Sequence, residues 1–347
     1  MYYYYYYCHL LFLGLMMMMM MMNNVWGVNS SMNTLNETCF DGATATFILR
    51  LGLYRDVCPE AEAIVFSWVE TAVYDDPRMA ASLLRLHFHD CFVNGCDASV
   101  LLDDTPSMVG EKTAGPNQNS LRGFEVIDSI KADLEYVCPQ TVSCADILAI
   151  AARDAVLLSG GPAWEVEMGR KDSLRASQTD ANNNIPGPNS DVPTLVSKFQ
   201  ALGLSPLDMV TLSGAHTLGK ARCFTFNSRL NAGGGAPDVN LEFIQSLQQL
   251  CSPAADVNAT LADLDAVTPA TFDNEYYVNL VSGKGLLASD DVLVNGGEDQ
   301  TRAVVESYVD DPALFFDNFK SSMVKMGRLA PAEGEGGEIR RNCRAVN

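Results

Sequence analysis

Residues 85–92 of the chain read RLHFHDCF, and this stretch carries the densest chemistry of the sequence. It closes a longer segment, Pro77 to Phe92, whose apolar spacing and proline near the first turn predict a helix. On a helix Arg85 and His89 are four residues apart, so their side chains project from one face. A cation beside an imidazole disfavours its protonation, so Arg85 favours a neutral His89 that can act as a base.

Two other interpretations of this stretch stay open from the residues alone. A histidine on an apolar helix is commonly a satisfied core residue, and His87 points about 200° away from His89. A zinc site built from His87, His89 and Cys91 would use suitable ligand types. Residues i and i+2 of a helix do not converge on one ion, however, so the spacing is poor for zinc.

Further periodic segments predict a mainly α-helical body with almost no strands. Ser143 and Asp146 have the capping-box spacing before an apolar run that ends at Gly160-Gly161, which indicates a central, buried helix. Ser205-Pro206 has the order of a cap followed by proline and begins a helix that runs toward His216. Two more helices are predicted, over Glu60 to Ala72 and over Leu314 to Met326.

Composition limits the classes of protein that this chain can be. A length of 347 residues corresponds to one large domain or two modest ones. A formal charge of -20 disfavours a nucleic-acid binder and adhesion to anionic lipid. The hydrophobic content of 48% excludes a mainly disordered chain. Ten cysteines indicate a disulfide framework and an oxidising compartment.

Residues 1–45 differ from the body, residues 46–347, and we interpret them as a leader. The segment begins with Tyr2 to Tyr7 and has an apolar run that continues to Met22, which is short for a membrane span and suits a secretory signal. It lacks the usual basic start, so a wrongly assigned start of translation and a membrane anchor remain alternatives. Cys8 and Cys39 fall in this segment, which leaves eight cysteines for the body.

A second histidine lies in the segment Leu212 to Gly219, which reads LSGAHTLG. Small residues around His216 allow close approach of a bulky partner, although a packing site under a loop would use the same residues. With Arg85 to Ser99, this segment resembles the two signatures of the plant secretory (class III) haem peroxidases. The similarity runs from about Leu51 to Cys343 and includes the segments Gly160 to Ser173 and Thr271 to Tyr277.

The resemblance implies a fold of two helical halves, distal and proximal, that enclose one haem b. The chain has no Cys-x-x-Cys-His motif for covalent haem attachment, which agrees with a b-type haem. The resemblance makes His216 the axial ligand of the haem iron and Asp290 the acceptor for the other N–H of that imidazole. A carboxylate partner raises the basicity of such a ligand.

The implied reaction is reduction of hydrogen peroxide to water with oxidation of phenolic or other aromatic donors in two one-electron steps. His89 would act as base and then acid, and Arg85 would stabilise the charge that develops during O–O cleavage. Asn117 would hold His89, and Phe88 would cover the haem. The resemblance also places Arg78, Ser82 and Ser120 near the haem propionates. It places Pro186 at the site that binds aromatic donors.

Two calcium ions are also implied, one on each side of the haem. Carboxylate, hydroxyl and carbonyl oxygens are the ligands that Ca²⁺ takes. Glu111 would link Asn117 to the distal ion. The distal set is Asp90, Val93, Gly95, Asp97 and Ser99, and the proximal set is Thr217, Asp265, Thr268, Thr271 and Asp273.

Eight cysteines allow 105 pairings, and the residues alone do not choose among them. The resemblance implies Cys58–Cys138, Cys91–Cys96, Cys144–Cys343 and Cys223–Cys251. We also expect a secreted monomer of the extracellular space or cell wall. The acidic charge predicts no nucleic-acid partner and no stable membrane association. Asn258-Ala259-Thr260 is a glycosylation sequon in the body.

Departures from the family pattern leave donor preference open, because Asn189 follows Pro188 where some members carry an aromatic residue. Two rival functions are a calcium-stapled structural glycoprotein that has lost catalysis and a zinc hydrolase using residues 87–91. The presence of Arg85, His89 and His216 argues against the first, and the helical spacing argues against the second.

Overall fold

The structure, a computed structural model, describes residues 48–231, 240–252, 255–331 and 337–347. The predicted leader with Cys8 and Cys39 lies outside these residues. The described chain is mainly helical, as the sequence predicts, and its strands pair only as two-stranded sheets. The elements are β1 (Arg50–Leu51), α2 (Ala61–Asp75), α3 (Arg78–Cys91), η1 (Ser99–Leu101), η2 (Glu111–Thr113), α4 (Phe124–Val137), α5 (Cys144–Leu158), β2 (Glu167–Met168), β3 (Asp172–Ser173), α6 (Gln178–Asn184), α7 (Val192–Ala201), α8 (Pro206–Ser213), η3 (Gly214–Thr217), β4 (Lys220–Arg222), α9 (Cys223–Asn231), α10 (Leu241–Leu250), β5 (Leu261–Asp263), α11 (Glu275–Val281), α12 (Ala288–Asn295), α13 (Asp299–Asp310), α14 (Pro312–Gly327) and β6 (Gly337–Glu338).

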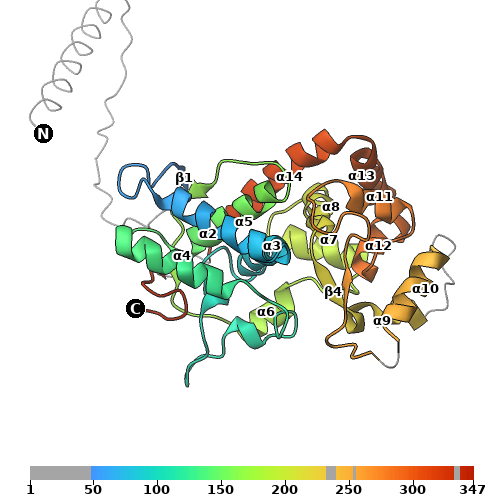
Figure 1. Cartoon of the computed structure of the whole chain (residues 1–347), viewed down its shortest axis with the longest axis horizontal. Coiled ribbons are helices and arrows are strands. Elements are labelled where there is room, and N and C mark those ends of the chain that lie inside the picture. The colour runs from blue at the N-terminus through green and yellow to red at the C-terminus, as the bar shows by residue number, and fades with distance from the viewer. Residues whose placement is uncertain (1–47, 232–239, 253–254, 332–336) are drawn as a thin grey trace, which may run out of the picture. The chain divides into compact units, whose positions relative to one another are not determined.

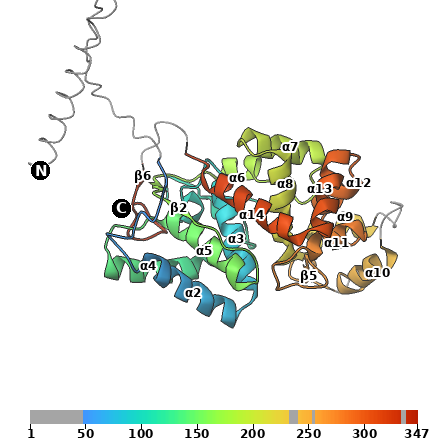
Figure 2. The same ribbon diagram turned by 90° about the horizontal axis from the view of Figure 1, so that it is seen from above.

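The helices form two groups. Helices α2, α3, α4 and α5 pack on one another, and α7, α8, α11, α12 and α13 form a second group. Figures 1 and 2 show the two groups side by side, with α14 running along both. Contacts of α14 with α8 and with α3 join the groups. The antiparallel strand pairs β1–β2, β3–β6 and β4–β5 are only two or three residues long and tie distant loops together.

Helix α5 is the centre of the first group. Ser143 caps it by accepting a hydrogen bond from the backbone N–H of Asp146 at 3.1 Å, as the capping-box spacing predicts. Every residue from Cys144 to Val156 except Arg153 is buried, and α5 packs against α2 and α3. Full burial of each large aliphatic side chain stabilises the fold by about 1.5–3 kcal/mol, so this helix gives α3 a rigid support.

The predicted helix bounds differ from the observed ones by one to three residues, as for α14, which begins at Pro312 and ends at Gly327 rather than at Leu314 and Met326. Helix α2 continues to Asp75, three residues beyond the predicted Ala72. Helix α8 ends at Ser213, and His216 lies in the 3-10 turn η3 rather than on an α-helix. A side chain at Gly214 would meet the Tyr277 hydroxyl at 2.3 Å, so the turn is pressed against α11 in a way that sequence periodicity does not reveal.

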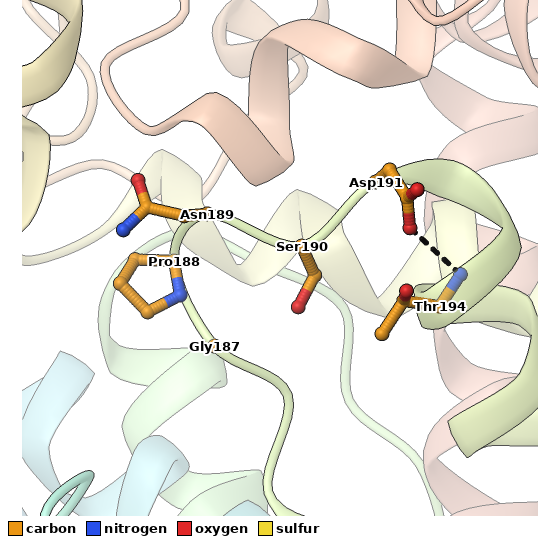
Figure 3. Close-up of a pocket in the computed structure, with 6 residues that line it drawn as sticks. All are labelled: Gly187, Pro188, Asn189, Ser190, Asp191 and Thr194. Atoms are coloured by element: carbon orange, nitrogen blue, oxygen red, sulfur yellow. Dashed lines mark hydrogen bonds between the residues drawn. The ribbon is translucent and has the colours of Figure 1, made fainter.

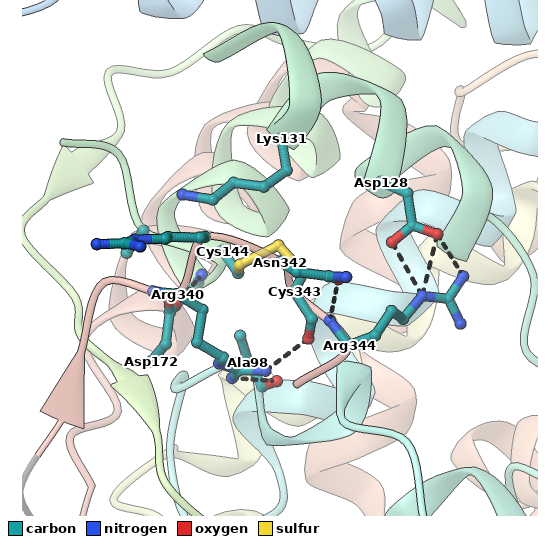
Figure 4. The surroundings of a disulfide bond; sticks show 12 residues. Ala98, Asp128, Lys131, Cys144, Asp172, Arg340, Asn342, Cys343 and Arg344 are labelled. Atoms are coloured by element: carbon teal, nitrogen blue, oxygen red, sulfur yellow. Dashed lines mark hydrogen bonds and ion pairs between the residues drawn. A yellow bond between two sulfur atoms is a disulfide. The ribbon is translucent and has the colours of Figure 1, made fainter. Parts of the chain in front are cut away.

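Four disulfides join the cysteines of the described residues, with the pairing that the family resemblance implies: Cys58–Cys138, Cys91–Cys96, Cys144–Cys343 and Cys223–Cys251. Around Cys144–Cys343 the C-terminal segment crosses the first helical group (Figure 4). There the buried Arg340 donates to the carbonyl oxygen of Ala98 at 2.7 Å, and its backbone N–H donates to Asp172 at 2.9 Å. The C-terminus therefore fixes the loop that follows α3.

In the part of the chain that the structure describes, none of the helices combines the length and apolar character needed to cross a bilayer.

Candidate active site

Helix α3 presents the predicted distal residues on one face. Arg78, Ser82, Arg85 and His89 follow one another at intervals of four, three and four residues, which is the spacing of a single helical stripe. The imidazole of His89 is buried, whereas Arg85 is only partly buried. Beside them the Phe88 ring packs against Phe92 with centroids 4.2 Å apart.

The hydrogen bonds around Asn117 determine which nitrogen of His89 carries the proton. Asn117 donates from its side-chain amide to the backbone carbonyl of Glu111 at 2.8 Å. Its Oδ1 therefore faces Nδ1 of His89, at 2.5 Å, and can only accept. Nδ1 must hold the hydrogen, which leaves the lone pair of Nε2 free as a base. Burial, and next the charge of Arg85, lower the pKa of His89 well below its ordinary value, so the ring is neutral at pH 7.

Arg85 is held by the loop that precedes α4. Its guanidinium donates to the carbonyl oxygens of Pro116 at 2.9 Å and Ser120 at 3.1 Å, and to the Ser120 hydroxyl at 3.1 Å. Three of its five N–H groups are thus engaged, and two remain for a ligand. Burial and the neighbouring Arg222 lower the pKa of Arg85 to about 10, so the group stays cationic at neutral pH.

Arg78, Ser82 and Ser120 have less specific surroundings. The Ser82 hydroxyl donates to the carbonyl oxygen of Arg78 at 2.9 Å, and the Ser120 hydroxyl donates to that of Pro116 at 3.0 Å. Arg222, which sequence reasoning did not single out, reaches from β4 to the carbonyl oxygen of Asn119. It adds a second positive charge near Arg85, where an anionic group would be favoured.

On the second helical group His216 is tied to a carboxylate. Its Nδ1 lies 2.8 Å from Oδ1 of Asp290, and the Tyr276 hydroxyl donates to the same oxygen at 3.0 Å. A carboxylate only accepts, so Nδ1 of His216 carries the hydrogen and Nε2 presents a lone pair. The backbone N–H of Leu287 donates to the other oxygen of Asp290 at 3.2 Å, which fixes the orientation of the carboxylate. Tyr276 was missed at the sequence level, because only its motif was recognised.

The predicted distal calcium residues meet in one buried cluster. Asp90, Asp97, Ser99 and Glu111 are all nearly inaccessible to solvent. One oxygen each of Asp90, Ser99 and Glu111 is buried without a hydrogen-bond partner. Burial raises the pKa of Asp97 to about 6 and that of Glu111 to about 8. Burying a carboxylate without a partner costs free energy, and a cation that takes these oxygens as ligands would remove that cost.

The backbone of the same loop is bent around the cluster. Ala98 has a φ of 59° and Gly95 a φ of 100°, and an alanine in the left-handed region is uncommon. Val93 and Gly95 lie in the same loop and are buried. The backbone carbonyl of Glu111 also holds Asn117, so the cluster is connected to His89 through two hydrogen bonds.

The predicted proximal calcium residues also converge. The Thr217 hydroxyl lies 3.2 Å from Asp265, 3.1 Å from Asp273 and 3.3 Å from the carbonyl oxygen of Thr271. The Thr268 hydroxyl lies 3.2 Å from both carboxylates. Two hydroxyl hydrogens cannot serve so many acceptors at once, which is the arrangement that a hard cation stabilises. Asn279, not predicted, donates to Asp265 at 2.9 Å and orients it.

The alternative zinc site is not formed. His89 is bonded to Asn117, and the His87 ring lies instead 3.6 Å from the sulfur of Cys91. In the described segments the histidine and cysteine atoms close enough for one ion are those of His87, Cys91 and Cys96, but the two sulfurs are joined to each other as a disulfide. Burial lowers the pKa of His87 to about 3, so this ring is a neutral core group.

A surface hollow of about 510 Å³ lies next to the predicted donor-binding Pro186. It is lined by Gly187, Pro188, Asn189, Ser190, Asp191 and Thr194, and Figure 3 shows the polar side chains along the loop that enters α7. The carbonyl oxygen of Pro188 accepts from the backbone N–H of Ser289 at 2.9 Å. The loop is therefore anchored one residue away from Asp290, the partner of His216.

Comparison with known proteins agrees with this geometry. Residues 65–311 match the family model described as peroxidase. The chain belongs to the peroxidase family. It is 60% identical over 336 residues to Peroxidase 40 of Arabidopsis thaliana, which covers 93% of this chain and 95% of the relative. It is 53% identical over 300 residues to Peroxidase 4 of Vitis vinifera, which covers 86% of this chain and 92% of the relative.

These relatives make the protein a class III plant peroxidase, an enzyme that acts on hydrogen peroxide and uses haem. The residues of the site fit that cofactor. His216 offers a free Nε2 lone pair on an imidazole whose other nitrogen is held by a carboxylate, the arrangement typical of an iron ligand. Its side chain is 38% exposed between the buried Gly214 and Thr217, so a planar ligand can reach it.

Proposed function

We propose that this peroxidase uses hydrogen peroxide to oxidise phenolic or other aromatic donors in two one-electron steps, with His89 and Arg85 as its distal catalytic residues. The observation that carries the proposal is the fixed tautomer of His89. Asn117 accepts from Nδ1, so the neutral, basic Nε2 is presented beside a guanidinium with two free N–H groups. A base and a fixed positive charge are what cleavage of a peroxide bond needs.

The protein groups would act in a fixed order. Nε2 of His89 takes a proton from one peroxide oxygen and returns it to the other, which leaves as water. Arg85 stabilises the negative charge on the departing oxygen while the proton is in transit, in a site where burial strengthens the interaction. Haem held by Nε2 of His216 would supply the two electrons for cleavage of the O–O bond. Asp290 and Tyr276 keep the His216 ring in the orientation that this requires.

Aromatic donors would approach beside Pro186, where the 510 Å³ hollow gives room for a small molecule. Its polar lining by Asn189, Ser190 and Asp191 suits donors that carry hydroxyl groups. Phe88 occupies the distal face next to His89, with ring centroids 5.4 Å apart, and would keep such donors away from the peroxide site. Small peroxide and bulky donors would therefore use different approaches.

The test begins with the absorption spectrum of the purified protein. We expect a Soret band that shifts when peroxide is added. The band should return to its original position when a monophenol is added. Two one-electron steps predict that two phenol molecules are consumed for each peroxide. A haem-free protein that binds only calcium would overturn the enzymatic proposal in favour of a structural glycoprotein. A stoichiometry of one phenol for each peroxide would overturn the one-electron steps alone.

We further propose that both oxygen clusters bind Ca²⁺. The partnerless buried oxygens of Asp90, Ser99 and Glu111, and the crowded hydroxyls of Thr217 and Thr268, support this. Each cluster includes the residue that follows a site histidine, so each ion would brace the backbone beside His89 or His216.

Chelation is expected to reduce peroxide turnover before far-UV circular dichroism changes, because four disulfides retain the fold. Elemental analysis must show that the ions have left. Unchanged turnover in a calcium-free sample would exclude the proposed role.

Secretion to the extracellular space or cell wall, as a monomer, completes the proposal. Four disulfides persist in an oxidising compartment and are rare in reducing ones. Asn258, which heads the predicted sequon, is exposed in a turn, as attachment of a glycan requires. Expression in plant cells, followed by mass spectrometry of the wall fraction, tests this. Protein that stays inside the cell and still carries residues 1–45 would contradict it.

A further inference from the structure

The tyrosines of the described chain fall into two distinct groups. Four are buried with bonded hydroxyls: Tyr54 to Asp146, Tyr276 to Asp290, Tyr277 to the carbonyl oxygens of Val210 and Thr211, and Tyr308 to Thr211. The other two, Tyr74 and Tyr136, are 86% and 89% exposed. Within the described residues no group bonds either of their hydroxyls. These two side chains are free phenols on the surface of an enzyme proposed to oxidise phenols.

The fold keeps the two exposed phenols apart. Helices α2 and α4 are antiparallel neighbours, because Cys58 before α2 is bonded to Cys138 after α4 and Trp68 donates to Asp133 midway at 2.8 Å. Figures 1 and 2 show the two helices side by side. Tyr136 lies at the disulfide end of this pair and Tyr74 at the other end. At 1.5 Å per residue, the length of α2 separates them by about 20 Å.

We propose that Tyr74 and Tyr136 are oxidised by the enzyme itself and couple to the same residues of other copies as dityrosine. This inference rests on the proposed one-electron oxidation of phenols. Each of two tyrosines loses one electron and the proton of its hydroxyl group, and a carbon–carbon bond forms between ring carbons next to the oxygens. The C–H bond at each of these two carbons then breaks, and its proton returns to the phenol oxygen. One hydrogen peroxide accepts the two electrons and two protons and becomes two waters. No further oxidant is needed.

The separation of the two phenols decides the form of the product. Tyr74 and Tyr136 of one chain cannot reach each other, so every coupling joins two copies. A molecule with two reactive sites forms chains, whereas a molecule with one site stops at a dimer. Coupling through Tyr74 and Tyr136 is therefore expected to give a ladder of dimers, trimers and larger species when peroxide is present and external donors are absent. A net charge of -20 repels copies from each other, so added salt should accelerate coupling.

The experiment uses the haem-loaded full-length chain in which Tyr2–Tyr7 are replaced by phenylalanine, so that only the described tyrosines contribute. This parent is compared with its Tyr74→Phe, Tyr136→Phe and double variants on denaturing gels after addition of peroxide. Each single variant is the matched control for the other, because it changes one exposed hydroxyl and leaves the packing intact. We expect a ladder from the parent, dimers alone from each single variant, and monomer from the double variant.

Two further readouts separate the possible results. Mass spectrometry of tryptic peptides should find dityrosine links at Tyr74 and Tyr136 only. Nitration by tetranitromethane, which needs no haem, should modify these two residues and leave Tyr54, Tyr276 and Tyr277 unmodified. Links or nitration at the buried tyrosines, or a ladder that survives in the double variant, would overturn the inference.

The proposed function and this inference can fail separately. If the parent oxidises an added monophenol but stays monomeric with peroxide alone, the inference is wrong and the proposed function stands. If it oxidises no monophenol, the proposed function fails first. An excess of monophenol should suppress the ladder, since the external donor competes for the same oxidising equivalents.

Discussion

Replacement of Asn117 by valine tests the mechanism most directly. The variant keeps a side chain of similar size and deletes both hydrogen bonds of the amide, the 2.5 Å contact with His89 and the 2.8 Å bond to the carbonyl oxygen of Glu111. Nδ1–H of His89 is then buried without an acceptor. Nothing selects the tautomer in which Nε2 is the base, and the imidazolium formed during proton transfer loses its partner.

The expected loss follows from the charge on His89 in the transition state. A hydrogen bond to a charged group contributes about 1.5–3 kcal/mol, against about 0.5–1.5 kcal/mol for a neutral pair. The amide therefore stabilises the imidazolium over the neutral ring by about 1–1.5 kcal/mol. With about 1.4 kcal/mol for each factor of ten, the reaction with peroxide should slow by about tenfold.

Stopped-flow measurement of the second-order rate of the haem spectral change with peroxide checks this value. The control is Asn182→Ala, which removes another amide from the same region, the bond that Gly115 donates to Asn182 at 2.8 Å. It does not touch His89, so its rate should equal that of the parent. A valine variant as fast as the parent, or an equal slowing in both variants, would refute the role assigned to Asn117.

Three other outcomes are expected. Asp290→Asn weakens the hold on His216, so haem transfer to a stronger haem-binding acceptor should be about 10–100 times faster, as for other partners of metal-bound histidines. Gly214→Ala forces a Cβ to within 2.3 Å of the hydroxyl of a buried tyrosine and should lower unfolding free energy by about 1–3 kcal/mol, whereas Gly187→Ala, with its nearest atom at 3.8 Å, should be neutral in denaturant titrations. Burial raises the pKa of Asp154 from 3.8 to about 6. The protonated carboxyl therefore stabilises the fold fully below pH 3.8, and this contribution to the free energy of unfolding is lost as the pH rises through 6. The unfolding free energy of the parent should fall by about 3 kcal/mol over this pH range, and that of Asp154→Asn should not. Denaturant midpoints that change equally with pH in the parent and the variant would contradict this.

The local elements and the chemistry of single helices follow from the order of neighbouring residues. The spacing of Arg85 and His89 placed both on one face of α3, because helical periodicity is a property of neighbouring residues. The Ser143 and Ser205 caps identified the starts of α5 and α8 for the same reason. Family motifs then pointed to His216 and Asp290, which lie 74 residues apart and which no periodicity connects.

The features that depend on how distant segments meet become visible only in the folded chain. The end of α8 before His216 is set by the packing of Gly214 on Tyr277, and the Tyr276 bond to Asp290 requires α11 and α12 to lie together. The carbonyl oxygen that orients Asn117, and so fixes the tautomer of His89, belongs to a loop whose path sequence does not give. Periodicity records which face of an element is buried but not which partner covers it. The exposure of Tyr74 and Tyr136 and the distance between them are likewise consequences of packing α2 against α4.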